Sequence, residues 1–187
     1  MSKPAEAPVG SDATNPGPPS AVTPWRRLLA YKWLLLLAAF VVVADQLSKA
    51  WIARRLPFGT YLEADGAIAV IPGFFNLVHV GNTGAAWSLF TGRSVLLAAL
   101  AAATLVAIFL GRRALGLHET IAQICFGLLC GGILGNLLDR IRHGHVIDFL
   151  DFHFGSYPYP TFNLADSGIC VGVALYLFHS LRHPRGF

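Results

Sequence analysis

The chain has 187 residues, of which 55% are hydrophobic and 13% are charged, and its formal net charge is +4. Soluble domains carry about 25% charged residues, so this composition argues against a soluble globular enzyme and against a disordered protein. The positive excess is small and scattered, which argues against nucleic-acid binding. The length suits one folded domain.

Residues 1–24 differ in composition from the rest of the chain. They hold six of the eleven prolines, interspersed with Gly, Ser and Ala. Because such a segment cannot bury a core, we expect a disordered tail over residues 1–24 and a folded domain over residues 25–187. The apolar run after the tail is preceded by basic residues, as in a signal peptide, but it lacks a small-x-small cleavage site. We therefore interpret this run as an uncleaved membrane anchor.

Four apolar segments are candidates for membrane-spanning helices, because a bilayer core of about 30 Å needs about 20 helical residues. They are residues 28–52, 94–110, 120–138 and 164–181. Between the first two lie three short runs of β-branched and aromatic residues, at 58–62, 67–71 and 74–80, separated by Gly and Pro. Such runs are typical of strands. Strand backbone cannot face lipid, so these residues should lie at or outside the interface. The sequence predicts an all-α four-helix transmembrane bundle with a small extracytoplasmic β-element between spans one and two.

An even number of spans places both termini on the same side of the membrane. With the termini inside, eight Lys and Arg residues lie in the inner segments and six in the outer ones. The pair Arg112 and Arg113 in a short inner loop adds to this bias. The positive-inside rule therefore favours cytoplasmic termini.

Four acidic residues from distant parts of the chain meet at the outer membrane face in this topology. They are Asp45, Asp139, Asp148 and Asp166. Ionisable groups in or beside spans are costly and indicate function. Asp45 can pair with Lys49, four residues later on the same helix. Asn136, Asp139 and Arg140 share one helix face. The simpler interpretations are an ion pair at a helix end for Asp45 and Lys49, and polar contacts between helices for the other three.

Asp148 and Asp166 each stand among apolar neighbours, without a cation beside them in the sequence. A solvated loop acid and a helix-capping acid are the simpler interpretations. Two carboxylates brought together in a low-dielectric site cannot both ionise, so one holds a proton while the other stays charged. Such a pair can activate water as a base and protonate a leaving amine as an acid. The sequence therefore predicts amide hydrolysis by Asp148 and Asp166, with neither a metal nor a cofactor.

The two carboxylates have different expected roles. Asp166 lies in the first turn of the predicted fourth span, where the helix dipole favours an anion, and Asn163 is placed to cap that helix. Asp148 lies in the apolar run VIDFLDF, which favours the protonated form. We therefore expect Asp166 to be the resting base and Asp148 the acid.

Other kinds of site are less well supported by the sequence. The serines lack a GxSxG setting, and His143, His145 and His153 lie near acids without the HExxH pattern of a metal site. The three cysteines lie in apolar stretches, so we expect buried thiols. A proton-coupled transporter and a non-catalytic membrane adaptor remain as alternatives, although the acids gather at one face and no inverted repeat is visible.

Five short blocks, in this order, resemble those of the lipoprotein signal peptidases (signal peptidase II), a family of bacterial intramembrane aspartyl proteases. They are DQLSK at 45–49, NTGAAWS at 82–88, GNLLDR at 135–140, VIDF at 146–149 and FNLADS at 162–167. The resemblance implies an endopeptidase that cleaves prolipoproteins just before a diacylglyceryl-modified cysteine, at the outer face of the inner membrane. It also implies a β-cradle on the outer leaflet and a short lid-like helix before the fourth span. Trp87 departs from the family, which usually has Phe there, and we expect this difference to alter the width of the groove.

The resemblance further implies the roles of individual residues. Asp148 and Asp166 match the catalytic aspartates. Residues that support the site or bind substrate match at Asp45, Lys49, Asn82, Gly84, Asn136, Asp139, Arg140 and Asn163. The implied partners are the diacylglyceryl-prolipoprotein substrate, membrane lipid and a globomycin-type inhibitor, and we expect a monomer.

Overall fold

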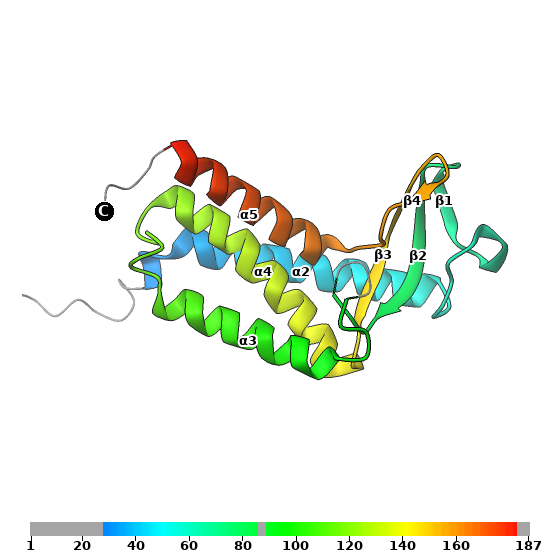
Figure 1. Cartoon of the computed structure of the whole chain (residues 1–187), viewed down its shortest axis with the longest axis horizontal. Coiled ribbons are helices and arrows are strands. Elements are labelled where there is room, and N and C mark those ends of the chain that lie inside the picture. Colours follow the sequence, from blue (N-terminus) through cyan, green and yellow to red (C-terminus); the bar gives the residue numbers. More distant parts are fainter. Residues whose placement is uncertain (1–27, 86–88, 183–187) are drawn as a thin grey trace, which may run out of the picture.

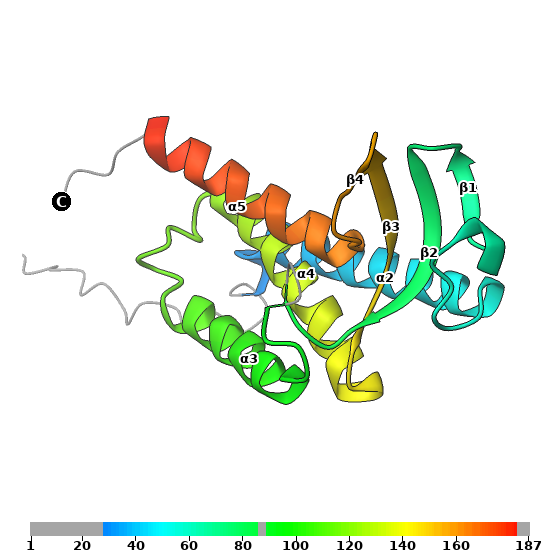
Figure 2. The same ribbon diagram turned by 45° about the vertical axis from the view of Figure 1, so that its right-hand side comes forward.

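The computed structural model describes residues 28–85 and 89–182, so the expectations for residues 1–24 and for Trp87 lie outside the described residues. Figure 1 shows four helices side by side, with a small sheet at one end of the molecule. The helices are α2 (Lys32–Arg55), α3 (Ser94–Leu110), α4 (Thr120–His143) and α5 (Leu164–Arg182). In both views α4 lies between α3 and α5 (Figure 1, Figure 2).

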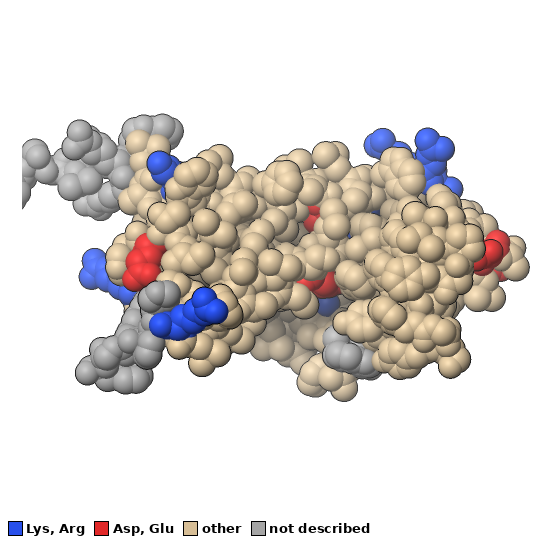
Figure 3. Space-filling model, turned by 90° about the horizontal axis from the view of Figure 1, so that it is seen from above, with Lys and Arg blue, Asp and Glu red and all other residues tan. Residues whose placement is uncertain are grey.

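Three of these helices, α2, α4 and α5, are long and apolar enough to cross a membrane, whereas α3 is apolar but has 17 residues. On the face shown in Figure 3, charged side chains gather at the two ends of the molecule, and the surface between them is almost free of charge apart from a few atoms near the middle. A water-soluble protein would distribute charge over this belt. The chain is therefore built as a membrane protein.

Glycines on α4 allow its neighbours to approach closely. A Cβ atom at Gly131 would lie 2.8 Å from the Ala38 carbonyl oxygen of α2. One at Gly127 would lie 3.0 Å from the Leu34 carbonyl oxygen, and one at Gly132 would overlap the Ala165 carbonyl oxygen of α5. Small residues spaced by four lie on one helix face and let membrane helices pack with their backbones close together. This packing brings the polar residues of α2, α4 and α5 together.

The fourth helix begins where the sequence predicts. The Asn163 side chain accepts a hydrogen bond from the Asp166 backbone N–H at 2.9 Å, and Asp166 Oδ2 accepts one from the Asn163 backbone N–H at 3.2 Å. This reciprocal arrangement is a capping box, which satisfies N–H groups that the helix itself leaves unpaired. The prediction that Asn163 caps this helix is confirmed.

The sheet is antiparallel, and half of it comes from a region where no strand was predicted. Its strands, in spatial order, are β1 (Ile68–Ile71), β2 (Phe75–Asn82), β3 (Val146–Phe154) and β4 (Tyr157–Pro158). The two later segments predicted within residues 58–80 form β1 and β2. The first contributes a single bridge, from Thr60 to His79. The predicted β-element between spans one and two is therefore present as β1 and β2, and the unpredicted strands β3 and β4, between α4 and α5, extend it.

The short helix implied for the loop before the fourth span is absent, and this expectation is wrong. Residues 144–163, all of which are described, contain two strands and turns. Their aromatic and β-branched residues favour extended backbone, and Pro158 and Pro160 cannot donate the N–H bonds of a helix. The described short helix at this end is η1 (Glu63–Asp65), in the loop after α2.

The sheet is joined to the bundle by a small apolar core. Ile52 and Leu56, at the end of α2, pack with Phe149 of β3. Strand β2 pairs with β3 so that Val80 lies opposite Asp148 and Asn82 lies opposite Val146. Asn82, at the end of β2, and Asp148, near the start of β3, therefore lie at the end of the sheet that is next to α4 and α5.

Candidate active site

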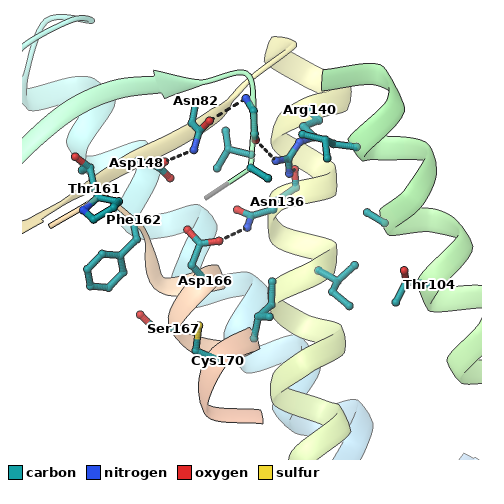
Figure 4. A pocket seen from close by; sticks show the side chains of 18 of the residues that line it. Asn82, Thr104, Asn136, Arg140, Asp148, Thr161, Phe162, Asp166, Ser167 and Cys170 are labelled. Atoms are coloured by element: carbon teal, nitrogen blue, oxygen red, sulfur yellow. Dashed lines mark hydrogen bonds between the residues drawn. The ribbon is translucent and has the colours of Figure 1, made fainter. Parts of the chain in front are cut away.

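A cavity of about 630 Å³ lies where α3, α4 and α5 meet the inner end of the sheet. Six of the ten predicted site residues line it: Asn82, Gly84, Asn136, Arg140, Asp148 and Asp166. Figure 4 shows that the side chains of Asp148 and Asp166 approach one another inside it from different elements. The remaining wall is largely apolar, with Leu97 and Ala101 from α3 and Ile169 from α5.

Asp148 is held by two amides. Its Oδ2 accepts a hydrogen bond from Asn82 Nδ2 at 3.0 Å, and its Oδ1 accepts one from Asn163 Nδ2 at 2.7 Å. The residue is only 2% exposed. Burial, followed by the negative charge of Asp166, raises the pKa of Asp148 to about 7. Removal from water disfavours a carboxylate, so this group can hold a proton near neutrality.

Asp166 lies in the first turn of α5. Its Oδ1 accepts a hydrogen bond from Asn136 Nδ2 at 2.7 Å, and its Oδ2 accepts the Asn163 backbone bond of the capping box. Asn163 therefore contacts both carboxylates, through its side chain to Asp148 and through its backbone to Asp166. One residue fixes the two acids relative to one another.

A buried ionic network lies behind the cavity wall and contains three more predicted residues. Lys49 Nζ lies 2.8 Å from Asp45 Oδ2 and 2.7 Å from Asp139 Oδ2, so the predicted pair of Asp45 and Lys49 is confirmed and extended. All three side chains are at most 2% exposed. Lys49 Nζ also donates to Asn136 Oδ1 at 3.1 Å. The network thus orients Asn136, whose other amide atom holds Asp166.

The same network reaches the backbone of the two segments that carry the acids. Asp45 Oδ1 accepts a hydrogen bond from the Ala165 N–H at 3.0 Å, and Asp139 Oδ2 accepts one from the Ile147 N–H at 3.2 Å. In the sequence, Ala165 immediately precedes Asp166, and Ile147 immediately precedes Asp148. The network therefore positions the backbone on which Asp148 and Asp166 stand.

Gly84 and Arg140 join the loop after β2 to α4. Arg140 Nη2 donates to the Gly84 carbonyl oxygen at 3.0 Å, and the Gly84 N–H donates to Asn82 Oδ1 at 2.9 Å. A Cβ at Gly84 would lie 2.6 Å from the Leu89 carbonyl oxygen, so this position requires glycine. Arg140 Nε is buried and has no hydrogen-bond partner among the described residues.

Gln46 belongs to the site although the sequence analysis did not select it. It donates to Asp139 Oδ1 at 2.8 Å and to the Gly135 carbonyl oxygen at 3.3 Å, and its own Oε1 accepts from Arg142 Nη1 at 2.9 Å. Gln46 lies inside the block DQLSK at 45–49, so the resemblance of that block is the sequence signal that could have identified it.

The histidines and cysteines have other surroundings. His153 Nε2 lies 2.6 Å from Asp151 Oδ2, and the His145 ring packs against Phe58. Within the described ranges no three His, Cys, Asp or Glu side chains are grouped so as to hold a metal ion. Cys125 and Cys130 are buried as expected, but Cys170 is exposed. Burial was the wrong prediction for Cys170, because this residue of α5 lines the open cavity (Figure 4).

Comparisons with known proteins identify the family of this chain. The family model described as Signal peptidase (SPase) II matches residues 37–182. A lipoprotein signal peptidase from Burkholderia cenocepacia is 39% identical over 171 residues, which cover 89% of this chain and 92% of that protein. Another, from Oleidesulfovibrio alaskensis, is 43% identical over 155 residues and covers 79% and 94%.

A solved structure agrees as well. It is described as a bacterial membrane enzyme determined by the in meso method at 2.3 Å resolution. It superposes with a TM-score of 0.71 at 33% identity, covering 80% of this chain and 87% of the other. The chain therefore belongs to the signal peptidase II family, the peptidases that cleave signal peptides from prolipoproteins.

Proposed function

We propose that Asp148 and Asp166 are the catalytic pair with which this peptidase cleaves a prolipoprotein just before its diacylglyceryl-modified cysteine. The observation that supports this most is that two carboxylates from separate elements enter one cavity and are held by a single residue, Asn163. A shared site of this kind separates the protonation states of two acids, so that one serves as base and the other as acid.

In this mechanism Asp166 is the resting base. Its Oδ2 is held at the N-terminus of α5, where the helix dipole stabilises an anion. It accepts a proton from a water molecule while the water oxygen forms a bond to the scissile carbonyl carbon. Asp148, protonated at rest, gives its proton to the amide nitrogen as the carbon–nitrogen bond breaks. The products are a free carboxyl group on the signal peptide and an amine on the cysteine.

The other predicted residues position these groups and the substrate. Arg140 lines the cavity, so its guanidinium group supplies a donor for a substrate carbonyl oxygen. Asn82 and Gly84 line the cavity beside Arg140, to which the Gly84 carbonyl oxygen is hydrogen-bonded. Asp45, Lys49 and Asp139 act through Asn136 and through the backbone on which the two acids stand.

For the membrane we propose four spans with cytoplasmic termini, with α3 as a short span of about 25 Å at 1.5 Å per residue. The α3–α4 loop with Arg112 and Arg113 lies at the end of the molecule opposite the sheet (Figure 1), which supports a cytoplasmic position for that end. The sheet and the acids then lie at the outer face of the bacterial inner membrane. Residues 1–24 form a cytoplasmic tail ahead of a peptidase domain at 25–187.

The substrate reaches the site from the lipid. Its acyl chains lie against the apolar surface of the bundle, where each buried CH₂ contributes about 0.8 kcal/mol. The apolar wall made by α3 and α5 receives the signal peptide, and a globomycin-type inhibitor competes for this wall. The enzyme acts as a monomer, since one chain supplies both acids.

The test is cleavage of a diacylglyceryl-prolipoprotein by the purified protein in detergent. Asp148→Asn and Asp166→Asn should each lower kcat at least about 100-fold, the usual contribution of one general acid or base. Asp151→Asn is the matched control. Asp151 is also buried, lies on the same strand and is not among the described lining of the cavity, so its variant should retain cleavage. Full cleavage by either folded dyad variant would refute the mechanism.

A further inference from the structure

A second cavity, of about 580 Å³, adjoins the first on its outer side. The described residues that line it come from strands and loops, and none belongs to a helix. Three tyrosines stand in its wall: Tyr61, Tyr157 and Tyr159. Its volume lies within the range of about 300–1,000 Å³ that protein ligand sites occupy.

The two cavities meet at the acid pair. Asn82 and Asp148 line both, as do Tyr159 and Thr161 from the loop before α5. Figure 4 shows Asp148, Asn82 and Thr161 on the same side of the site. A peptide bond held at Asp148 therefore has one flank in each cavity.

The two cavities differ in chemistry. The first is walled by apolar side chains of helices, such as Leu97, Ile133 and Ile169. The second presents hydroxyl groups and aromatic rings, including Thr83 and Thr161. The two flanks of the substrate differ in the same way, because the signal peptide stays in the membrane whereas the mature polypeptide leaves it.

We infer that the second cavity binds the polypeptide on the C-terminal side of the lipidated cysteine, and that Tyr61, Tyr157 and Tyr159 set the preference for residues there. This inference rests on the proposed function of Asp148 and Asp166. The second cavity is then a specificity site for the mature sequence, beside the first cavity, which binds the signal peptide.

The cavity wall is preformed, as a selective site requires. Tyr61 and Thr161 both stand in this wall. The Tyr159 N–H donates to the Phe152 carbonyl oxygen at 2.8 Å, and its ring packs edge-on against Phe162, with 5.9 Å between ring centroids. Tyr157 is 55% exposed on β4 and so presents its ring to an incoming chain.

The experiment compares two series of diacylglyceryl peptides. One series varies the second and third residues after the cysteine between small and bulky side chains, and the other varies the residues before it. Tyr61→Ala and Tyr157→Ala each open the wall of the second cavity, and neither residue lines the first cavity. We expect each to raise kcat/KM for bulky relative to small residues after the cysteine about tenfold, and to change the other series less than about twofold. Val70→Ala, at an exposed β1 residue outside the described linings, should change neither ratio.

Crosslinking locates the same segment without relying on the tyrosine variants. A photoreactive residue at the third position after the cysteine, bound to the inactive Asp148→Asn enzyme, should label residues 61 and 157–161. Labelling confined to α3, α4 or α5 would overturn the inference. So would unchanged preference in both tyrosine variants, or a preference that follows acyl chain length instead. Failure of the wild-type enzyme to cleave any peptide would contradict the proposed function itself.

Discussion

At the scale of single residues, Lys49 has an unusual environment for an ammonium group. It lies between two buried carboxylates, Asp45 and Asp139, and is 2% exposed. Bringing three charges out of water is costly, and their mutual attraction offsets the cost only while all three are present. Lys49 is therefore a positioning residue whose removal acts on folding before it acts on chemistry.

Lys49→Met should lower the free energy of unfolding by about 3–5 kcal/mol, because it leaves two buried carboxylates without a cation. Thermal or denaturant unfolding in detergent measures this loss. Adding Asp45→Asn and Asp139→Asn to the same variant should recover part of the stability. An unchanged unfolding midpoint in Lys49→Met would show that the network contributes nothing.

The raised pKa of Asp148 makes cleavage depend on pH with a defined sign. The acid must be protonated, so kcat should fall as pH rises through about 7. The negative charge of Asp166 is part of the cause, and Asp166→Asn should therefore lower the pKa of Asp148. Infrared titration of isotope-labelled carboxyl groups measures it. An Asp148 pKa that stays at its wild-type value in this variant would contradict the coupling.

The raised pKa of Asp148 also makes the free energy of unfolding depend on pH. The usual pKa of an aspartate is 3.8, so between that pH and about 7 the folded protein holds a proton that the unfolded chain releases. The contribution of Asp148 to stability is complete below this window and is lost as pH rises through it. Asp148→Asn should flatten this part of the stability profile in unfolding experiments at pH 4, 5.5 and 7.

Most residues of the site could be selected from the sequence, because ionisable groups among apolar neighbours are conspicuous there. Asp148 and Asp166 are examples. Gln46 was missed, since an uncharged amide beside an ion pair gives no such signal. The contact of Arg140 with the Gly84 carbonyl oxygen also needs the fold, because the two residues are joined only through the placement of the loop after β2.

At the scale of elements, α4 organises the bundle through its glycines. Gly127, Gly131 and Gly135 recur every fourth residue and face α2, and Gly132 faces α5. A Cβ at Gly135 would lie 2.6 Å from Asp45 Oδ2, so the close packing also leaves room for the ionic network. This spacing is visible in the sequence and indicates a helix–helix interface.

Gly131→Val should destabilise the bundle by about 1–3 kcal/mol, because its side chain would meet the Ala38 backbone, which cannot yield without moving α2. Thermal unfolding in detergent is the measurement. The control is Ala102→Val on the exposed face of α3, which should leave the midpoint within experimental error. Equal midpoints for both variants would contradict the close packing.

The strands show where sequence patterns were insufficient. Segments of β1 and β2 could be predicted from β-branched residues bounded by Gly and Pro. Strand β3 has a nearly continuous apolar run, VIDFLDFHF, whose pattern does not alternate as a half-exposed strand does. Its pairing with β2 joins residues about 70 positions apart, and nothing local specifies that partner.

At the scale of the whole molecule, the distribution of charge defines two ends and an apolar belt (Figure 3). Four apolar helices could be predicted from length and hydropathy, and the structure has a helix at each. The sequence could not predict that α4 would be central, because that depends on the packing of helix faces rather than on their order in the chain.

Accessibility to a membrane-impermeant maleimide tests the orientation. The measurement uses intact spheroplasts that express a variant without the native cysteines. There Glu63→Cys, beside the sheet, should react with the maleimide. Arg113→Cys, in the α3–α4 loop, should react only after permeabilisation, because the proposed topology places it in the cytoplasm. The opposite pattern would reverse the topology, and reaction of both in intact cells would contradict the four-span arrangement.

The capping box at Asn163 has a consequence for biosynthesis. The residue that starts the last helix also holds both acids, so helix initiation and alignment of the reactive groups are one structural event. A nascent chain that has reached only residue 160 carries the sheet and three helices but lacks Asp166. During translation the protein therefore remains an incomplete protease until its final segment has been inserted, and premature termination yields an inert product.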